Sequence, residues 1–331
     1  MQPHPNSVLI DLRALVYNLT RLAAVVKSDA YGHGLVPISR TLEKNGVDAL
    51  AVAHLDEALE LRDAGIRGDI ILLSDLGTRE SCEYVVEKGL TPVIYSLDTA
   101  ERLNQAGRRR RKRIDVYLKV DTGMGRLGIC HKDVAGAFDR FSGFDHLALI
   151  GLTSHLSTAD DPDSDFVHAQ RRRFERIVSM GRARELGLRW NNISNSAGTA
   201  VHQNLHFDMV RCGIMLYGGL PHPDFKSPVP LKPVMHFRAR VLQLRVLEDR
   251  TPVSYGRTHY TEGDRQVAVI SSGYGNGIPR RLANRGVVLV EGKRVPIVGT
   301  IGMNLTLCDV TDIPHVRVGD EVVMLGSQGT A

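Results

Sequence analysis

Lys27 stands where a lysine is unexpected. It follows an unbroken apolar run, residues 22–26, which is typical of a strand buried on both faces. Burial at the end of such a strand shifts lysine toward the neutral amine, a nucleophile that forms a Schiff base with an aldehyde cofactor. Tyr31 and the turn-forming Gly32 and Gly34 follow. The alternative is a lysine whose charged head group reaches solvent, and this segment alone favours neither.

Other chemically versatile residues follow later predicted strands or lie in the last of them. In chain order they are Arg126, His155, Asn195, Ser196, Arg211, Cys212, Gly213 and Ile214. If the strands form a parallel barrel, their C-terminal ends meet on one face, and these residues converge there. The hydroxyl and backbone N–H groups around Ser196 and Gly213 could hold a phosphate, although each of these turns alone is as well explained as an ordinary turn.

The elements that must position these residues are strands that alternate with amphipathic stretches. We predict barrel strands at residues 23–27, 49–53, 70–74, 92–96, 115–120, 147–154, 190–194 and 209–217. Helical patterns lie at residues 56–64, 79–88, 99–106, 133–141 and 170–186. This alternation favours an α/β fold, a (β/α)8 TIM barrel, over the alternative of a doubly wound open sheet.

The composition and the pattern of predicted elements change after residue 217. Prolines crowd residues 221–233, which predicts a linker. Short β-rich runs with Gly and Asp turns follow, at residues 237–247, 266–271, 286–291, 294–298, 304–310 and 321–325. We therefore expect three parts: a barrel at 1–220, a linker at 221–235 and a separate all-β domain at 236–331. The barrel part includes a first strand at 8–10 and a helix at 12–22.

Three further patterns are set aside. Gly123-x-Gly125-x-x-Gly128 matches a dinucleotide fingerprint but lies in the fifth unit rather than the first. The aspartates of residues 161–165 imitate a calcium loop, yet the glycine and glutamate that such a loop needs are replaced by Phe166 and Arg172. The basic run at residues 108–113 is interpreted as a solvated loop after a helix.

Composition excludes several protein classes. The net charge of +5 over 331 residues is too small to indicate a nucleic-acid partner, and no apolar run is long enough to cross a membrane. Four widely spaced cysteines without a C-x-x-C pair favour reduced thiols over disulfides or a zinc site, and no signal-peptide pattern is present. We expect a cytoplasmic protein without a metal.

Taken together, seven segments resemble the alanine racemases, which are pyridoxal-phosphate (PLP) enzymes of fold type III. The matching segments are residues 25–34, 118–128, 153–160, 194–197, 210–218, 253–256 and 273–277. They occur in family order over nearly the whole chain. The family architecture, a barrel followed by a β-domain, agrees with the pattern of predicted elements.

The resemblance implies two bases. Lys27 would carry PLP and act as one base, and Tyr255 from a partner subunit would be the base on the opposite face. Racemisation removes the α-proton on one side and returns a proton on the other, so two opposed bases fit it. Arg211 would face the pyridine nitrogen, which it cannot readily protonate because arginine is a permanent donor. His155 would pack by the ring and link Arg211 to Tyr255.

The remaining roles are also implied by the resemblance. The other cofactor-binding residues would be Tyr31, Ser196, Gly213 and Ile214 at the phosphate, together with Asn195. Arg126 would bind the cofactor's phenolic oxygen and the substrate carboxylate, and Lys119, which is carbamylated in some relatives, would orient Arg126. Tyr274 and Met303 from the partner would line the substrate entrance and pocket.

The sequence departs from the family at three places. Asn304 stands where typical alanine racemases have Asp and resembles broad-spectrum racemases there. The stretch from Asp11 to Lys27 is shorter by about three helical turns. The chain ends at Ala331, shortly after its last predicted strand, and lacks the tyrosine that binds the cofactor phosphate in the family. Because that hydrogen bond is missing, we expect PLP to bind more weakly by about 1 to 2 kcal/mol.

We therefore expect a homodimeric racemase with shared active sites that interconverts L- and D-alanine and supplies D-alanine for peptidoglycan. One alternative is a broad-spectrum amino-acid racemase. Another is a PLP-binding protein with little catalysis. A decarboxylase of the same fold is disfavoured, because an arginine rather than an acid is expected at the pyridine nitrogen.

Overall fold

The computed structural model describes residues 6–18, 23–74, 76–161 and 163–326. These form two compact units. The barrel unit comprises the described residues from 12 to 232, and the β unit comprises residues 6–11 together with 233–326.

The strands of the barrel unit are parallel and form a closed ring. Neighbours in the ring are, in order, β2 (Ala23–Val25), β3 (Ala49–Val52), β4 (Asp69–Leu72), β5 (Thr91–Ile94), β6 (Ile114–Asp121) and β8 (Leu147–Thr153). A single bridge then joins Thr153 to Asn192, and the N–H of Arg211 donates to the carbonyl of Ser194 over 3.1 Å. Because β9 (Arg211–Cys212) pairs with β2, the ring closes and the predicted barrel is confirmed.

Two of the predicted strands differ from what the structure contains. The segment at 190–194 joins the ring through one bridge rather than a regular ladder. The strand predicted at 209–217 is too long: β9 ends at Cys212, and Ile214–Tyr217 is a 3₁₀ helix, η2. The backbone leaves the extended conformation at Gly213, with φ −116° and ψ −96°. A short strand, β7 (Ile129–Cys130), extends the edge of β6.

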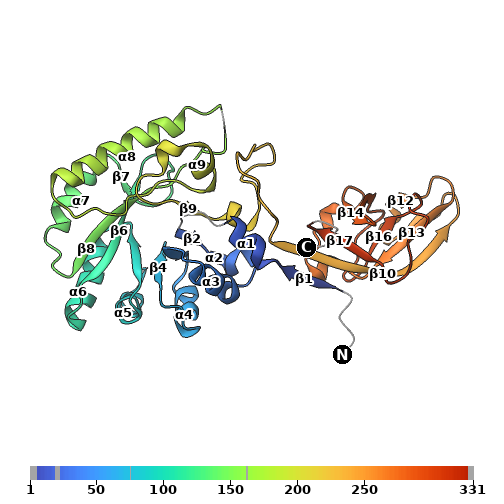
Figure 1. Ribbon diagram of the computed structural model, residues 1–331, viewed down its shortest axis with the longest axis horizontal. Helices are drawn as coiled ribbons and strands as arrows, with labels where there is room; N and C mark the ends of the chain where they lie inside the picture. The colour runs from blue at the N-terminus through green and yellow to red at the C-terminus, as the bar shows by residue number, and fades with distance from the viewer. Residues whose placement is uncertain (1–5, 19–22, 75, 162, 327–331) are drawn as a thin grey trace. The chain divides into compact units, whose positions relative to one another are not determined.

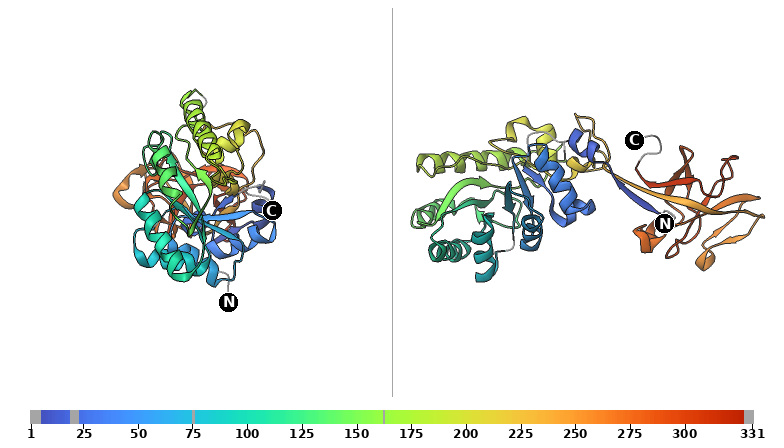
Figure 2. Two further views of the ribbon diagram at one scale, coloured as in Figure 1. Left: turned by 90° about the vertical axis from the view of Figure 1, so that its left-hand side faces the viewer. Right: turned by 60° about the horizontal axis from the view of Figure 1, so that its bottom comes forward.

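Helices lie around the ring, as Figure 1 and the left view of Figure 2 show. They are α1 (Leu12–Asn18), α2 (Lys27–Gly32), α3 (Leu35–Lys44), α4 (Leu55–Asp63), α5 (Arg79–Lys88), α6 (Leu97–Arg110), α7 (Val134–Phe141), α8 (Phe166–Ala183), α9 (Ser196–Val201) and the 3₁₀ turn η1 (Gln203–Leu205). Helix α1 agrees with the prediction over Leu12–Asn18, and residues 19–22 of that prediction lie outside the described residues.

Apolar side chains fill both layers of the barrel. Ile38, Leu103, Phe138 and Phe174 are fully buried on the helices, and each such side chain stabilises the fold by about 1.5–3 kcal/mol. Inside the ring, a second cluster is formed by Ala23, Val25, Ala49, Ala51, Ile71, Val93, Tyr117 and Ile150. These alternate along the strands with residues that face the helices, which is why the strands are apolar throughout.

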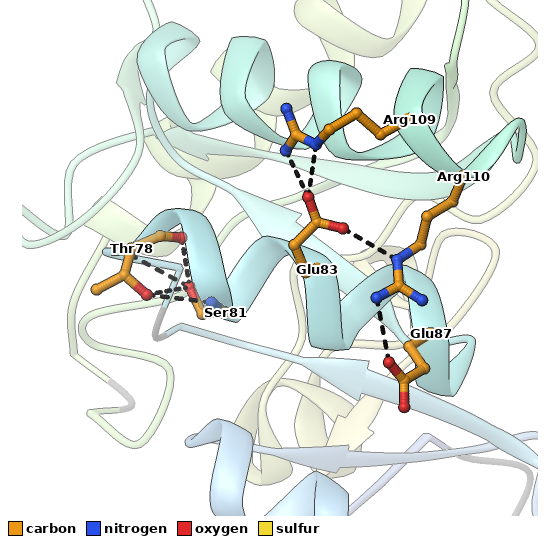
Figure 3. Close-up of polar contacts among 6 residues, drawn as sticks. All are labelled: Thr78, Ser81, Glu83, Glu87, Arg109 and Arg110. Carbon is orange, nitrogen blue, oxygen red and sulfur yellow. Dashed lines mark hydrogen bonds and ion pairs between the residues drawn. The ribbon is translucent and has the colours of Figure 1, made fainter.

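The basic run at 108–113 is solvent-exposed, as predicted, but only its second half is a loop. Its first three residues complete α6, and Arg111 caps the helix in the left-handed conformation. Figure 3 shows Glu83 of α5 between Arg109, at 2.6 Å, and Arg110, at 2.9 Å, with Glu87 a further partner of Arg110. The hydrogen bonds from Arg110 and then Arg109 lower the pKa of Glu83. Cations at a helix C-terminus are also favoured by the helix dipole.

The β unit is an antiparallel sheet. Its strands follow the order β15 (Lys293–Pro296), β14 (Val287–Val290), β17 (Glu321–Leu325), β10 (Met235–Leu247), β13 (Arg265–Ile270) and β16 (Thr306–Asp309). A bridge from Ile297 to Cys308 joins the two ends of this order. The hairpin of β11 (Pro252–Val253) and β12 (His259–Tyr260) and the 3₁₀ turns η3 (Tyr255–Arg257), η4 (Tyr274–Asn276) and η5 (Arg280–Leu282) complete the unit.

The first strand belongs to this β unit rather than to the barrel. β1 (Ser7–Ile10) pairs antiparallel with β10, and Asn6 accepts a hydrogen bond from Ser271. Val8 and Leu9 are exposed, so β1 is held mainly by its ladder of backbone hydrogen bonds. In the described part of the chain, no helix has the length and apolar character needed to span a bilayer.

Candidate active site

A cavity of about 460 Å³ opens at the C-terminal ends of the barrel strands. It is lined by all ten barrel residues for which the family resemblance implies a role: Lys27, Tyr31, Lys119, Arg126, His155, Asn195, Ser196, Arg211, Gly213 and Ile214. They come from five separate strand ends. Closure of the ring is therefore what brings these distant residues together.

Lys27 is the first residue of α2, which is a left-handed turn rather than an ordinary α-helix. Residues 28–31 all have φ between 53° and 56°, a conformation that costs roughly 1–2 kcal/mol per residue for L-amino acids. Glu57 accepts a hydrogen bond from the N–H of Ser28, and Asp29 accepts one from the N–H of Leu35 over 2.6 Å. Lys27 is half-buried and lies two residues beyond the end of β2, so the strand predicted at 23–27 is too long.

Tyr31, Ser196 and Gly213 meet at one corner of the cavity. The hydroxyl of Ser196 accepts hydrogen bonds from the N–H of Gly213, at 3.0 Å, and of Met215, at 3.4 Å. A Cβ atom on Gly213 would collide with the phenol oxygen of Tyr31, so only glycine permits this approach. Asn195 caps α9 by accepting from the N–H of Gly198 over 3.0 Å. The corner is therefore built around small residues and hydroxyl groups.

Arg211 is almost fully buried at the base of the cavity. Its Nη2 donates to the carbonyl of Ser154 over 2.6 Å and lies 3.5 Å from Nδ1 of His155, while Nη1 has no hydrogen-bond partner among the described residues. Burial lowers the pKa of Arg211 only to about 10, so the guanidinium stays charged. Burial, then the charges of Arg211 and Lys119, lowers the pKa of His155 to about 2. A neutral His155 therefore accepts from Arg211 through Nδ1.

Lys119 and Arg126 also line the cavity. Desolvation, followed by the charges of Arg211 and Arg126, lowers the pKa of Lys119 to about 7. Arg126 follows a tight turn organised by Asp121, whose carboxylate accepts from the N–H of Gly123 at 2.8 Å and of Gly125 at 2.9 Å. Burial alone would raise the pKa of Asp121, but these backbone hydrogen bonds lower it on balance.

Charge around the cavity is strongly unbalanced. Four of its lining residues are basic, namely Lys27, Lys119, Arg126 and Arg211, and one is acidic, Asp160. A low-dielectric cavity with this surplus of cations and an unused buried guanidinium N–H favours an anionic occupant.

The three remaining predicted residues lie in the β unit, on one exposed surface. Tyr255 is 73% exposed, Tyr274 42% and Met303 58%. Backbone hydrogen bonds join the loops that carry Tyr274 and Met303, since Tyr274 N–H donates to Gly302 over 3.0 Å and Gly275 N–H donates to Met303 over 2.8 Å. Thr300 donates to the carbonyl of Tyr255 over 2.8 Å.

Several residues of the site were not found by sequence reasoning. They are the supports Glu57, Asp121, Thr122, Ser154 and Gln170 and the cavity-lining Asp160. Asp121 and Asp160 lie within segments that had already been singled out, so their position offered a signal. Gln170 is one of several polar residues at the start of a helical pattern, and nothing in the sequence distinguishes it from a solvent-exposed residue.

The chain matches two protein-family models. "Alanine racemase, N-terminal domain" matches residues 10–221, and "Alanine racemase, C-terminal domain" matches residues 234–331. The two matches together span nearly the whole chain.

Individual relatives agree with the family models. The alanine racemase of Syntrophobacter fumaroxidans is 40% identical over 98% of this chain and 88% of its own length, and that of Geobacter sulfurreducens is 39% identical with the same coverage. The structure of alanine racemase from Streptomyces coelicolor A3(2) matches with a TM-score of 0.90 and 32% identity, covering 98% of this chain and 89% of that one. The alanine racemase of Bartonella henselae with covalently bound pyridoxal phosphate matches with a TM-score of 0.87 and 32% identity, covering 98% and 91%. From the barrel, the cavity and these matches, the chain belongs to the alanine racemase family.

Proposed function

We propose that this protein is a PLP-dependent alanine racemase that interconverts L- and D-alanine. The observation that carries the proposal is the convergence of Lys27, Arg211 and the Ser196–Gly213 corner on one cavity rich in positive charge. An amine, a pyridine-facing donor and a phosphate corner are the three contacts that PLP needs from a barrel.

The residues present fit PLP. Nη1 of Arg211 is a buried donor with no partner among the described residues, and the pyridine nitrogen is an acceptor that would satisfy it. The phosphate suits the corner formed by Tyr31, Ser196, Gly213 and Ile214, with Asn195 capping the adjacent helix. Lys27 would hold the cofactor covalently through its Nζ. The surplus of cations matches the negative charge of the phosphate and the phenolic oxygen.

When bound, PLP acidifies the α-proton of the amino acid by withdrawing electrons from Cα. Lys27 would accept or deliver that proton on one face, and Tyr255 of the partner subunit would do so on the other. One base must hold its proton while the other lacks it, so each direction of the reaction starts with the opposite pair of protonation states.

Arg211 and His155 would limit side reactions. A charged arginine donates a hydrogen bond but keeps its proton, so a ring nitrogen facing it would stay neutral and the ring would withdraw electrons less strongly. His155, held neutral by burial and by nearby cations, would anchor Arg211 without adding a charge.

Arg126 would bind the cofactor's phenolic oxygen and the substrate carboxylate, and Lys119 would orient it. The neutral amine of Lys119 is the form that reacts with carbon dioxide, and its pKa near 7 makes that form abundant. A carbamate there would replace one of the crowded positive charges with a negative one and would attract Arg126.

The proposal includes a homodimer with shared active sites in the cytoplasm, with D-alanine used for peptidoglycan. Exposed Tyr255, Tyr274 and Met303 form an amphipathic surface of the kind that suits a partner and would complete the partner's substrate pocket. The four cysteines are free thiols, which suits a reducing compartment.

The test combines the reaction with the cofactor link. Purified protein with PLP should convert L-alanine to D-alanine and the reverse to an equal mixture, measured by chiral chromatography. After borohydride reduction, peptide mapping should place the reduced cofactor on Lys27. Labelling at Lys27 without racemisation would favour the alternative of a PLP-binding protein with little catalysis.

Asn304 favours one second candidate, a broad-spectrum racemase. It lies beside Met303, and its side-chain oxygen faces Gly275 next to Tyr274. Comparison of kcat/KM for alanine with that for lysine, arginine and serine decides between the two. A preference for the basic substrates would replace the first proposal with the second.

A further inference from the structure

Gln170 of α8 is a fully buried polar residue that lies between two loops of the site. Its side-chain Nε2 donates to the hydroxyl of Thr122 over 3.2 Å and to the carbonyl of His155 over 2.9 Å. Its Oε1 accepts from the N–H of Ser157 over 3.0 Å and from the hydroxyl of Ser157 over 3.1 Å. All four hydrogen-bonding positions of this amide are therefore used.

The orientation of this amide follows from its backbone partners. The N–H of Ser157 can only donate and the carbonyl of His155 can only accept, so Oε1 must face Ser157 and Nε2 must face His155. A carboxylate of the same shape would fail at the second contact, because two acceptors would face each other.

The hydrogen bonds continue from Gln170 toward the base of the cavity. The hydroxyl of Ser154 donates to the carbonyl of Val120, so the hydroxyl of Thr122, 2.8 Å away, must donate to Ser154 and accept from Gln170. The carbonyl of Ser154 accepts from Arg211 over 2.6 Å. Gln170, Thr122 and Ser154 form one directional chain, which ends beside the buried guanidinium.

This chain connects the two loops that carry Arg126 and His155. Thr122 opens the turn after β6 that leads to Arg126, and Ser154 and His155 follow β8 directly. Arg173 lies about one helical turn after Gln170 on α8. It donates to the carbonyl of Thr122 over 2.7 Å and strengthens the same connection. Helix α8 lies outside the cavity, so Gln170 acts on the site only through these loops.

We propose that Gln170 is a positioning residue for racemisation: by holding Thr122 against His155, it sets the loop of Arg126 relative to the loop of His155, against which Arg211 of β9 rests. The inference rests on the proposed function and adds a residue outside the cavity to it. A misplacement of about 1 Å at a reacting centre lowers the rate by about 10²-fold.

The central experiment compares Gln170→Leu with Val178→Ala. Both positions are buried on α8, and Val178 lies about two turns further along the helix than Gln170, so its variant reports the effect of lost core packing. We expect Gln170→Leu to lower kcat per bound cofactor by about 10²-fold and to raise the PLP dissociation constant, measured by absorbance titration, by about tenfold. Val178→Ala should lower Tm without either change.

Gln170→Glu adds a pH signature. The ionised carboxylate repels the carbonyl of His155, whereas the protonated acid again donates a hydrogen bond there. PLP affinity and kcat of this variant, relative to the wild type, should recover as the pH falls from 8 toward about 5, because a buried carboxyl group takes up its proton in this range. Gln170→Leu should show no recovery.

Thr122→Val and Thr122→Ser test the same chain if Gln170→Leu does not fold. Valine keeps the shape of threonine but removes the hydroxyl, and serine keeps the hydroxyl. The valine variant should reproduce the losses of kcat and PLP affinity, and the serine variant should recover most of both.

Equal kcat and equal PLP affinity in Gln170→Leu and Val178→Ala would overturn the proposal, as would a Gln170→Glu variant whose PLP affinity does not depend on pH. If the proposed racemase function itself is wrong, the experiment gives a different result. In that case the wild type binds PLP but does not racemise alanine, and the PLP affinities of the variants still decide the role of Gln170.

Discussion

The carboxylate of Glu57 accepts a hydrogen bond from the backbone N–H of Ser28, the residue that follows Lys27. Its second oxygen accepts from the N–H of Ala53 over 2.9 Å and of His54 over 3.0 Å. One side chain at the start of α4 therefore ties the left-handed turn after β2 to the end of β3. The turn needs such support because its conformation is intrinsically unfavourable.

Glu57→Ala should loosen the turn that carries Lys27. Three backbone N–H groups lose their acceptor, and we expect the free energy of unfolding to fall by about 1–3 kcal/mol. The fraction of protein that borohydride labels with PLP should fall as well. Glu60→Ala is the control, since Glu60 is an exposed residue of the same helix. Equal labelling in both variants would show that Glu57 does not hold the turn for Lys27.

Lys27→Ala should abolish covalent attachment of PLP. The variant removes the only atom that we propose bonds to the aldehyde, so the visible absorbance band and the borohydride-stable label should both disappear. Lys44→Ala, at an exposed lysine at the end of α3, should keep both. A label that persists in Lys27→Ala would assign the cofactor to another amine.

Tyr255→Phe should keep PLP but remove proton exchange on one face. The ring stays, the hydroxyl is lost, and only the face served by Lys27 can still exchange its proton. In deuterium oxide, we expect one enantiomer of alanine to keep exchanging its α-proton while conversion to the other falls by at least about 10²-fold. Tyr260→Phe changes another exposed tyrosine of the β unit and should act like the wild type. Full rates in both directions for Tyr255→Phe would exclude the two-base scheme.

Lys119 should make stability depend on pH. Its pKa is about 7 in the folded protein, against an ordinary value of 10.5. Between these two values the unfolded chain binds a proton that the folded chain does not, so the free energy of unfolding rises as the pH rises from about 7 to about 10. The Lys119 contribution to that rise is on the order of several kcal/mol at most.

Lys119→Met removes this titration. Urea unfolding in bicarbonate-free buffer at several pH values should give a flatter profile for Lys119→Met than for the wild type. Lys132→Met, at an exposed lysine, should follow the wild-type profile. Parallel profiles for wild type and Lys119→Met would show that Lys119 keeps its ordinary pKa when folded.

Prediction from the sequence succeeded where a residue follows a buried strand. Lys27, Arg126, His155 and Arg211 stand at or just after strand ends, and the barrel places every such end on one face. Local patterns are enough for this, because an apolar strand and the residue after it are neighbours in the chain. The same rule explains the errors, since the true ends of β2 and β9 depend on a left-handed turn and on the approach of Tyr31 to Gly213.

By itself, the amino-acid sequence determined the order of elements, the division between barrel and β-rich parts, and which chemically versatile residues follow the strands, because these follow from local periodicity and residue type. Only the tertiary structure decided that β1 joins the β unit, that burial among cations lowers the pKa of Lys119 and His155, and that Glu57 and Gln170 hold the loops of the site. These properties arise between residues that are far apart in the chain. Their hydrogen bonds and electrostatic energies exist only once the ring of strands has closed.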